Sequence, residues 1–174
     1  QILVLGASGG VGNACVQIAR MFDCFVIAGT SSSVKEQKLI ELGADVVINY
    51  STEPDFHRTV RAMTGDGVDV AVNYTGGDSW VKTLKCMKTN GRILTCGATA
   101  GFDPKTDIRF IWRKELQILG SNSWTKDDIE SLVNAVNNGI INPIIHEIIP
   151  LKDISRAHQI IESRNFFGKI VISF

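Results

Sequence analysis

Short apolar runs alternate along the chain with segments in which apolar residues recur every three or four positions. The runs are continuous, as expected for strands buried on both faces of a sheet. They cover residues 2–5, 24–29, 45–50, 68–77, 92–101 and 116–122. The amphipathic segments predict helices over 12–23, 33–43, 53–65, 79–91, 107–115 and 125–139. This alternation predicts an α/β fold with a six-stranded, doubly wound parallel sheet that carries helices on both faces.

Several helix ends carry capping signals. Ser33 followed by Glu36 predicts a capping box at the start of the second helix, and Gly43 predicts its C-cap. Pro54 falls in the first turn of the predicted third helix 53–65, where proline is tolerated. Thr125 precedes the sixth helix, whose first turn is acidic and suits the helix dipole.

The last part of the chain departs from this alternation. Residues 142–174 begin at a proline break and predict a strand, a helix and a final strand. The segment is too apolar for a free linker, so it either extends the sheet or belongs with a partner domain. Its isoleucines are then exposed, packed on the sheet domain, or shared with another copy. The residues concerned are Ile144, Ile145, Ile148, Ile149, Ile170 and Ile172.

Composition narrows the possible partners. The 174 residues include 18 basic and 18 acidic side chains, so no basic excess points to nucleic acid or an anionic membrane. No apolar run reaches the roughly 20 residues of a membrane helix. The first residues read as a strand and not as a signal peptide. Because the chain does not start with methionine, we expect it to be part of a longer protein.

The cysteines bear on the redox compartment and on metal binding. None of the four forms a CxxC pair or matches the spacing of a zinc motif. We therefore expect reduced thiols, a cytoplasmic location and no metal site in this chain.

The chain opens with the stretch "ILVLGASGGVG", in which a strand runs into a glycine-rich turn and then a helix. A phosphate at a helix N-terminus meets free N–H groups, but its close approach to the backbone excludes a Cβ at particular positions. Ala7-x-Gly9-x-x-Gly12 matches the dinucleotide fingerprint with alanine first, and Gly6-x-x-x-Gly10-x-Gly12 matches the spacing of short-chain dehydrogenases. The context predicts a dinucleotide site; the alternative is a tight turn without a ligand.

The end of the second strand indicates which dinucleotide. An acidic residue there holds the ribose hydroxyls of NAD(H) and repels a 2′-phosphate. Here no acid appears before Glu36, whereas Ser31, Ser32, Ser33 and Lys35 offer hydroxyl donors and a positive charge. This pattern favours NADP(H) over NAD(H); alternatively, the serines only cap the next helix.

Six stretches together resemble the medium-chain dehydrogenase/reductase superfamily, in its zinc-binding alcohol dehydrogenase and quinone oxidoreductase branches. They are "GASGGVG", "LGADVVINY", "GVDVAVNYTGG", "LKCMKTNGRILTCGATAG", "LQILGSN" and "FGKIVISF", and they span nearly the whole chain in the family's order. The resemblance implies that 1–141 form a Rossmann dinucleotide-binding domain. It also implies that 142–174 complete an N-terminal GroES-like catalytic domain outside this sequence. Any catalytic zinc then belongs to that domain.

The resemblance further implies cofactor-binding positions at the carboxyl ends of the strands and assigns no catalytic residue to this chain. The implied pyrophosphate turn is Ser8, Gly9, Gly10 and Val11, and the implied 2′-phosphate pocket is Ser32, Ser33 and Lys35. Tyr50 matches a position beside the adenosine end, and Thr75 and Gly76 match positions near the adenine ribose. Positions facing the nicotinamide are Cys96, Gly97, Ala98, Gly120, Ser121 and Asn122. Phe167 matches a position that can close over the cofactor.

The implied function is the cofactor-binding part of an NADP(H)-dependent oxidoreductase that transfers hydride to or from a small carbonyl, alcohol or quinone. The chain alone is expected to bind nucleotide without turnover. A non-catalytic NADPH sensor stays open as an alternative. A complete short-chain dehydrogenase is excluded, because Tyr50 and Tyr74 are followed four residues later by Pro54 and Asp78 and no YxxxK pair exists. Dimers of this family commonly pair their sixth strands edge to edge, so the resemblance, together with the weak charge of the edge strand 116–122, implies a homodimer through this strand.

Overall fold

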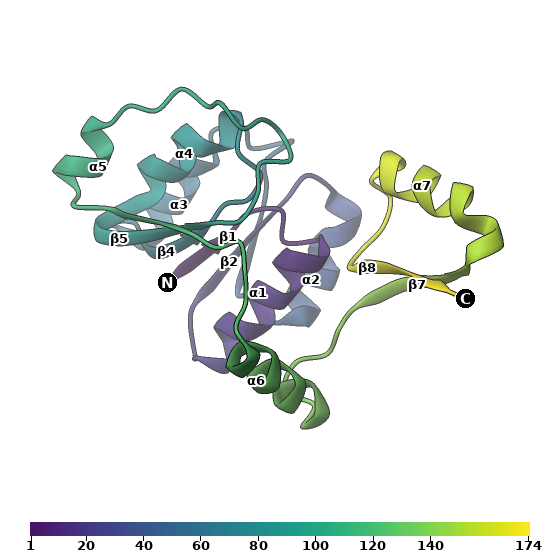
Figure 1. Cartoon of the computed structure of the whole chain (residues 1–174). Coiled ribbons are helices and arrows are strands. Elements are labelled where there is room, and N and C mark those ends of the chain that lie inside the picture. Colours follow the sequence, from purple (N-terminus) through teal and green to yellow (C-terminus); the bar gives the residue numbers. More distant parts are fainter.

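The computed structural model describes all 174 residues and confirms the α/β fold (Figure 1). Six parallel strands form one sheet in the order β3-β2-β1-β4-β5-β6. Their bounds are β1 Ile2–Val4, β2 Val26–Thr30, β3 Val46–Asn49, β4 Val68–Val72, β5 Met87–Thr95 and β6 Gln117–Gly120. The strand order reverses between β1 and β4, and ligands of open α/β sheets bind at the carboxyl ends of the strands beside this point.

Helices pack on both faces of the sheet: α1 (Gly10–Met21) and α2 (Glu36–Leu42) on one, and α3 (Phe56–Thr64), α4 (Asp78–Cys86) and α5 (Arg109–Arg113) on the other. A further helix, α6 (Lys126–Asn137), follows β6 and has no buried residue. Side chains alternate along each strand, so Leu3 packs with the α3–α4 layer while Val4 packs with the α1–α2 layer. These two apolar cores hold the carboxyl ends of β1 and β4 in place. None of the helices has the length and apolarity needed to cross a membrane.

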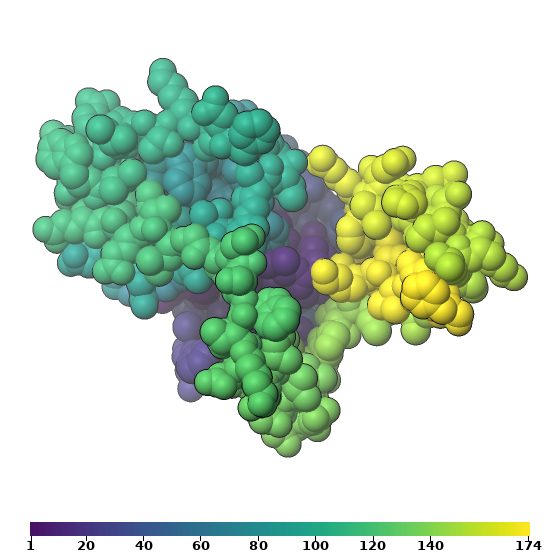
Figure 2. All heavy atoms as spheres, in the orientation of Figure 1, coloured from purple at the N-terminus to yellow at the C-terminus, as the bar shows by residue number.

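Residues 142–174 form a lobe with its own small sheet. The parallel strands β7 (Ile145–Pro150) and β8 (Lys169–Ser173) are joined through helix α7 (Ile154–Ser163), as the sequence predicts. Figure 2 shows this lobe in yellow, projecting from the molecule beside its purple N-terminal part. Ile149 is fully buried in the lobe, whereas Ile145 and Ile148 remain about half exposed. Ile144 packs against the α1–α2 core.

Several contacts attach the lobe to the sheet domain, and two of them lie at Gln17 and at Gly9. The Gln17 side chain pairs with both backbone groups of Asn142: Nε2 donates to the carbonyl at 3.0 Å, and Oε1 accepts from the N–H at 2.7 Å. Farther along, Gly168 pairs with Gly9 in an isolated parallel bridge. The second contact brings the start of β8 to the glycine turn.

The predicted boundary between the fourth helix and the fifth strand is wrong. The predicted helix 79–91 ends at Cys86, and β5 begins at Met87 instead of residue 92. Met87 is apolar and continues the helical pattern, but it is fully buried as the pairing partner of Val68. An irregularity in the pairing then follows, and Asn90 adopts a left-handed conformation with φ of 60°. Tertiary pairing therefore overrides local periodicity here.

The predicted capping box at Ser33 also fails, because a short 3-10 turn over Ser33–Lys35 precedes α2. Ser33 Oγ and Glu36 Oε1 instead both accept from Asn49 Nδ2, at 3.1 and 2.9 Å. The C-cap prediction is confirmed, since Gly43 has φ of 117°. Thr125 caps α6 as expected and completes a capping box with Asp128.

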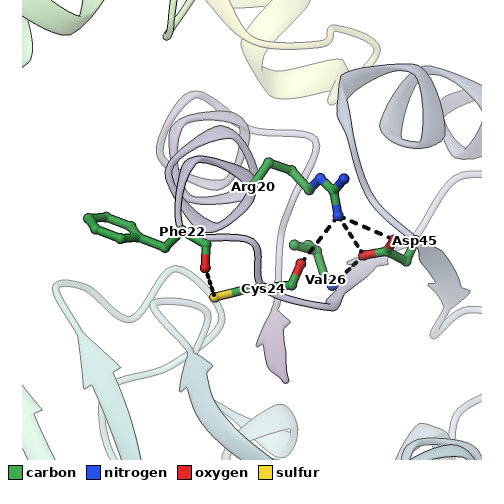
Figure 3. A network of polar contacts seen from close by, with 5 residues as sticks. All are labelled: Arg20, Phe22, Cys24, Val26 and Asp45. Carbon is green, nitrogen blue, oxygen red and sulfur yellow. Dashed lines mark hydrogen bonds and ion pairs between the residues drawn. The ribbon is translucent and has the colours of Figure 1, made fainter.

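The amino edge of the sheet is tied together by Arg20 and Asp45 (Figure 3). Asp45 Oδ2 accepts from the Val26 N–H at 2.7 Å and faces Arg20 Nη1 at 3.3 Å. The same Arg20 nitrogen donates to the carbonyl of Cys24 at 3.4 Å. The network connects the end of α1 with the starts of β2 and β3, at the edge opposite the glycine turn.

Candidate functional site

The turn between β1 and α1 leaves free backbone donors at a helix N-terminus. Gly9 precedes α1 in an extended conformation and provides no side-chain cap. The N–H groups of Gly10 and Val11 have no hydrogen-bond partner within the chain. A Cβ on Gly12 would lie 2.5 Å from the Ala7 Cα, so only glycine allows helix and turn to approach this closely. Free N–H groups and the positive end of a helix dipole are features that suit an anion.

The C-terminal lobe adds a cation to this turn. The Gly168 N–H donates to the Ser8 carbonyl at 3.0 Å, and the next residue is Lys169. The aliphatic part of the Lys169 side chain lies so close to Gly10 that any Cβ there would collide with it. Lys169 takes part in none of the ion pairs of the chain. Sequence reasoning missed Lys169, because only the Gly9–Gly168 pairing shows that "FGKIVISF" reaches the turn.

The residues expected to hold a 2′-phosphate follow β2 at the same edge. Lys35 Nζ donates to the Arg164 carbonyl at 2.7 Å and lies 5.7 Å from the centre of the Phe166 ring. Burial lowers the pKa of Lys35, and the charge of Lys38 acts in the same direction. Burial raises the pKa of Tyr50, whereas the Ser31 side chain and the charge of Arg164 oppose that rise. Lys35 therefore lies against the backbone of Arg164, and the charge of Arg164 acts on Tyr50 in the same region. The sequence analysis had not found Arg164.

The serines after β2 have different surroundings. Ser33 faces β3 through its bond with Asn49, so its oxygen already has one partner. The backbone carbonyl of Ser31 accepts from the Ser51 hydroxyl at 3.0 Å, which fixes the loop between β2 and α2. The Ser32 side chain makes no hydrogen bond to the rest of the chain and is the freer of the two predicted hydroxyls.

A cavity of about 150 Å³ lies between the carboxyl ends of β1, β3 and β4. Its lining includes Tyr50 and Thr75, which were predicted for the adenosine end of a cofactor. The turn after β4 is set by Asn73, which is fully buried and whose Oδ1 accepts from the N–H groups of Thr75 and Gly76 at 2.9 and 3.0 Å. Gly76 has φ of 67°, and a Cβ there would collide with the carbonyl of Gly101.

A second cavity of about 340 Å³ lies beside the loop after β5 and includes the predicted residues Gly76, Gly97 and Ala98. Cys96 is exposed next to it. Gly120 is the last residue of the edge strand β6, and Ser121 and Asn122 follow it; none of the three lines either of these two cavities. The Ser121 N–H donates to the Thr95 carbonyl at 2.9 Å, which keeps this segment beside the end of β5.

Phe167 is placed in the core in this structure. Its side chain is only 7% exposed and packs in the α1–α2 layer, with Lys38 Nζ 5.8 Å from the ring centre. Closure of this ring over a cofactor stays a prediction.

The described chain offers no donor set for a metal. No group of three or more His, Cys, Asp or Glu side chains is placed to hold an ion, and all four cysteines are free. Zinc therefore does not fit the residues of this chain.

Comparison with known proteins matches residues 10–138 to the zinc-binding dehydrogenase family. The chain is 32% identical to a quinone oxidoreductase of Rattus norvegicus, and the match covers 98% of this chain and 54% of that protein. It is also 31% identical to an acryloyl-coenzyme A reductase of Sulfurisphaera tokodaii, and this match covers 98% of this chain and 50% of that protein. The chain thus spans about half the length of these relatives.

Solved structures show the same fold over the same part of the chain. An NAD-dependent alcohol dehydrogenase superposes with a TM-score of 0.92 at 33% identity, over 99% of this chain and 50% of that protein. A 2-haloacrylate reductase gives a TM-score of 0.85 at 31% identity, over 98% of this chain and 56% of that protein. The chain belongs to the zinc-binding dehydrogenase family of the medium-chain dehydrogenase/reductase superfamily.

Proposed function

We propose that this chain is the nucleotide-binding part of an NADP(H)-dependent oxidoreductase. The observation that carries the proposal is the meeting of the free N–H groups of Gly10 and Val11 with the Lys169 side chain at the start of α1. Two backbone donors and one cation suit the two negative charges of a pyrophosphate. Gly12 keeps the turn low enough for the phosphates to reach the backbone.

The proposal extends to the form of the cofactor. Lys35 and Arg164 supply positive charge after β2, and the carboxylate of Glu36 is turned to Asn49. This arrangement favours a 2′-phosphate and hence NADP(H). Relatives support both forms: the alcohol dehydrogenase above is named NAD-dependent, while a mycobacterial protein at 26% identity and a TM-score of 0.85 was solved with NADPH.

The cofactor would donate a hydride to a small carbonyl, quinone or activated double bond, or accept one from an alcohol. Quinone, acryloyl-coenzyme A and 2-haloacrylate reductases among the relatives support small electrophilic substrates. The residues of this chain bind and orient; none is assigned as an acid or base. We further propose that the exposed side chains of Ile145 and Ile148 on β7 pack against a catalytic domain of the whole protein.

We also propose that the whole enzyme is a homodimer built through β6. This strand lies at the edge of the sheet, and all four of its residues are exposed. An unpaired edge with apolar side chains favours pairing with a second copy of the same strand.

Calorimetric titration of the chain with NADPH and with NADH tests the cofactor proposal. We expect NADPH to bind at least about tenfold tighter, roughly 1.4 kcal/mol. Lys35→Ala is expected to remove that preference, whereas Lys152→Ala, an exposed lysine of the C-terminal lobe, is expected to keep it. Equal binding of both nucleotides would overturn the 2′-phosphate assignment, and binding of neither would overturn the nucleotide site. Binding without hydride transfer by the full-length protein would indicate a sensor instead.

A further inference from the structure

Tyr74 lies directly beneath the glycine turn. It follows β4, and its hydroxyl donates to the Gly6 carbonyl at 2.7 Å. A Cβ on Gly12 would lie 2.6 Å from the same hydroxyl, and a Cβ on Gly6 would lie 3.1 Å from it. The tyrosine hydroxyl therefore fills the space between the first and last glycines of the turn.

The surroundings keep this hydroxyl protonated. Burial raises the pKa of Tyr74 far above its usual range, and the nearby Cys15, Tyr50 and Cys96 act in the same direction. The backbone N–H of Gly12 acts in the opposite direction. The hydroxyl thus donates to Gly6 at one end of the turn and lies beside Gly12 at the other.

The bond to Gly6 holds a peptide that is critical for the turn. Gly6 has φ of 63°, and the next N–H, that of Ala7, donates to the Gly29 carbonyl at 2.9 Å. The Gly6 oxygen also accepts from the Gly9 N–H at 3.0 Å. With Tyr74 in place, this oxygen is directed into the protein. A carbonyl oxygen released at this turn would place negative partial charge next to a bound anion.

The same residue reaches the loop after β5. The Tyr74 carbonyl accepts from the Thr99 N–H at 3.2 Å, and a Cβ on Gly97 would lie 3.6 Å from that carbonyl. Tyr74 is thus fixed by its backbone on one side and supports the glycine turn with its side chain on the other.

We propose that Tyr74 is a positioning residue for pyrophosphate binding, which orients the glycine turn through Gly6 and leaves the N–H groups of Gly10 and Val11 for the ligand. The inference rests on the proposed nucleotide-binding function. It assigns Tyr74 to the pyrophosphate, which NADPH and NADH share, and not to the 2′-phosphate.

Tyr74→Phe tests the inference, because phenylalanine keeps the ring and removes only the hydroxyl. We expect the affinities for NADPH and NADH to fall together by about tenfold, so that their ratio is unchanged. Binding of adenosine 2′-monophosphate, which lacks the pyrophosphate, is expected to be unaffected. In ³¹P spectra of bound NADPH the pyrophosphate resonances are expected to shift while the 2′-phosphate resonance stays in place. Tyr50→Phe is the matched loss of a tyrosine hydroxyl at the predicted adenosine end. It is expected to weaken adenosine 2′-monophosphate binding and to leave the pyrophosphate resonances in place.

Unchanged affinities in Tyr74→Phe would overturn the inference, as would an equal loss for adenosine 2′-monophosphate, since that would indicate a general folding role. If the unmodified chain binds neither dinucleotide, the proposed function itself fails. Should Tyr74→Phe not fold, the chain labelled with 3-fluorotyrosine gives the answer, because it contains only two tyrosines. The ¹⁹F signal of Tyr74 is expected to shift with both dinucleotides and not with adenosine 2′-monophosphate; no shift with either dinucleotide, although both bind, would overturn the inference.

Discussion

At the scale of single residues, Lys169 is separated from Gly10 by almost the whole chain, yet its side chain covers the first turn of α1. Lys169→Ala is expected to weaken NADPH and NADH alike, by about 10- to 100-fold, because a hydrogen bond to a charged group contributes roughly 1.5–3 kcal/mol. Lys169→Arg is expected to retain most of the affinity. Titration of the three proteins with both nucleotides measures this, and an unchanged Kd for Lys169→Ala would remove the lysine from the site.

A site residue could be predicted from the sequence only where its role depends on residues that are its neighbours in the chain. Gly9, Gly10 and Gly12 were identified because a phosphate turn imposes its spacing on consecutive residues. Lys169, Arg164 and Tyr74 reach the same site through tertiary contacts that no spacing encodes. The sequence predicts Ser33 as a helix cap, but its hydroxyl oxygen instead accepts from Asn49, a buried residue of β3.

At the scale of elements, the order of strands and helices followed from hydrophobic periodicity, while their ends did not. The predicted helix 79–91, which ends at the Asn90-Gly91 pair, is longer than α4, because Met87 pairs with Val68 and begins a strand there. Where a cap is formed by neighbouring residues, as at Thr125 and Asp128, the prediction holds. Boundaries that depend on a partner strand cannot be seen in a single segment.

The network at Asp45 gives a prediction for the amino edge of the sheet (Figure 3). Asp45→Ala is expected to lower the free energy of unfolding by about 1–2 kcal/mol, since the Val26 N–H loses its acceptor. Asp45→Asn is expected to cost less, because an amide oxygen still accepts that bond and the partly exposed Arg20 pair contributes little. Urea unfolding measures both. Nucleotide affinity is expected to stay unchanged; weaker binding would show that the two edges of the sheet are coupled.

At the scale of the whole molecule, the lobe formed by 142–174 contributes residues to the candidate site, so the first half of the chain contains only part of that site. Gly168 pairs with Gly9, and Lys35 bonds to the carbonyl of Arg164. The final residues therefore complete a surface that begins with β1. The sequence analysis identified the strand–helix–strand pattern of this segment, but left open whether it packs on the sheet domain, because its apolar residues alone do not reveal which face they cover.

The edge strand β6 is the basis of the proposed dimer. Ile118 and Leu119 on β6 are 39% and 44% exposed, because β6 is the last strand of the sheet and one of its edges is unpaired. A second copy of β6 would bury these side chains and satisfy the free backbone groups of the edge. Ile118→Lys places a charge in that interface, whereas Val34→Lys places one on a residue that is 81% exposed elsewhere. Light scattering during gel filtration is expected to show dimers for the unmodified protein and Val34→Lys, but monomers for Ile118→Lys. If the unmodified protein is a monomer at all concentrations, β6 must be protected by a different partner.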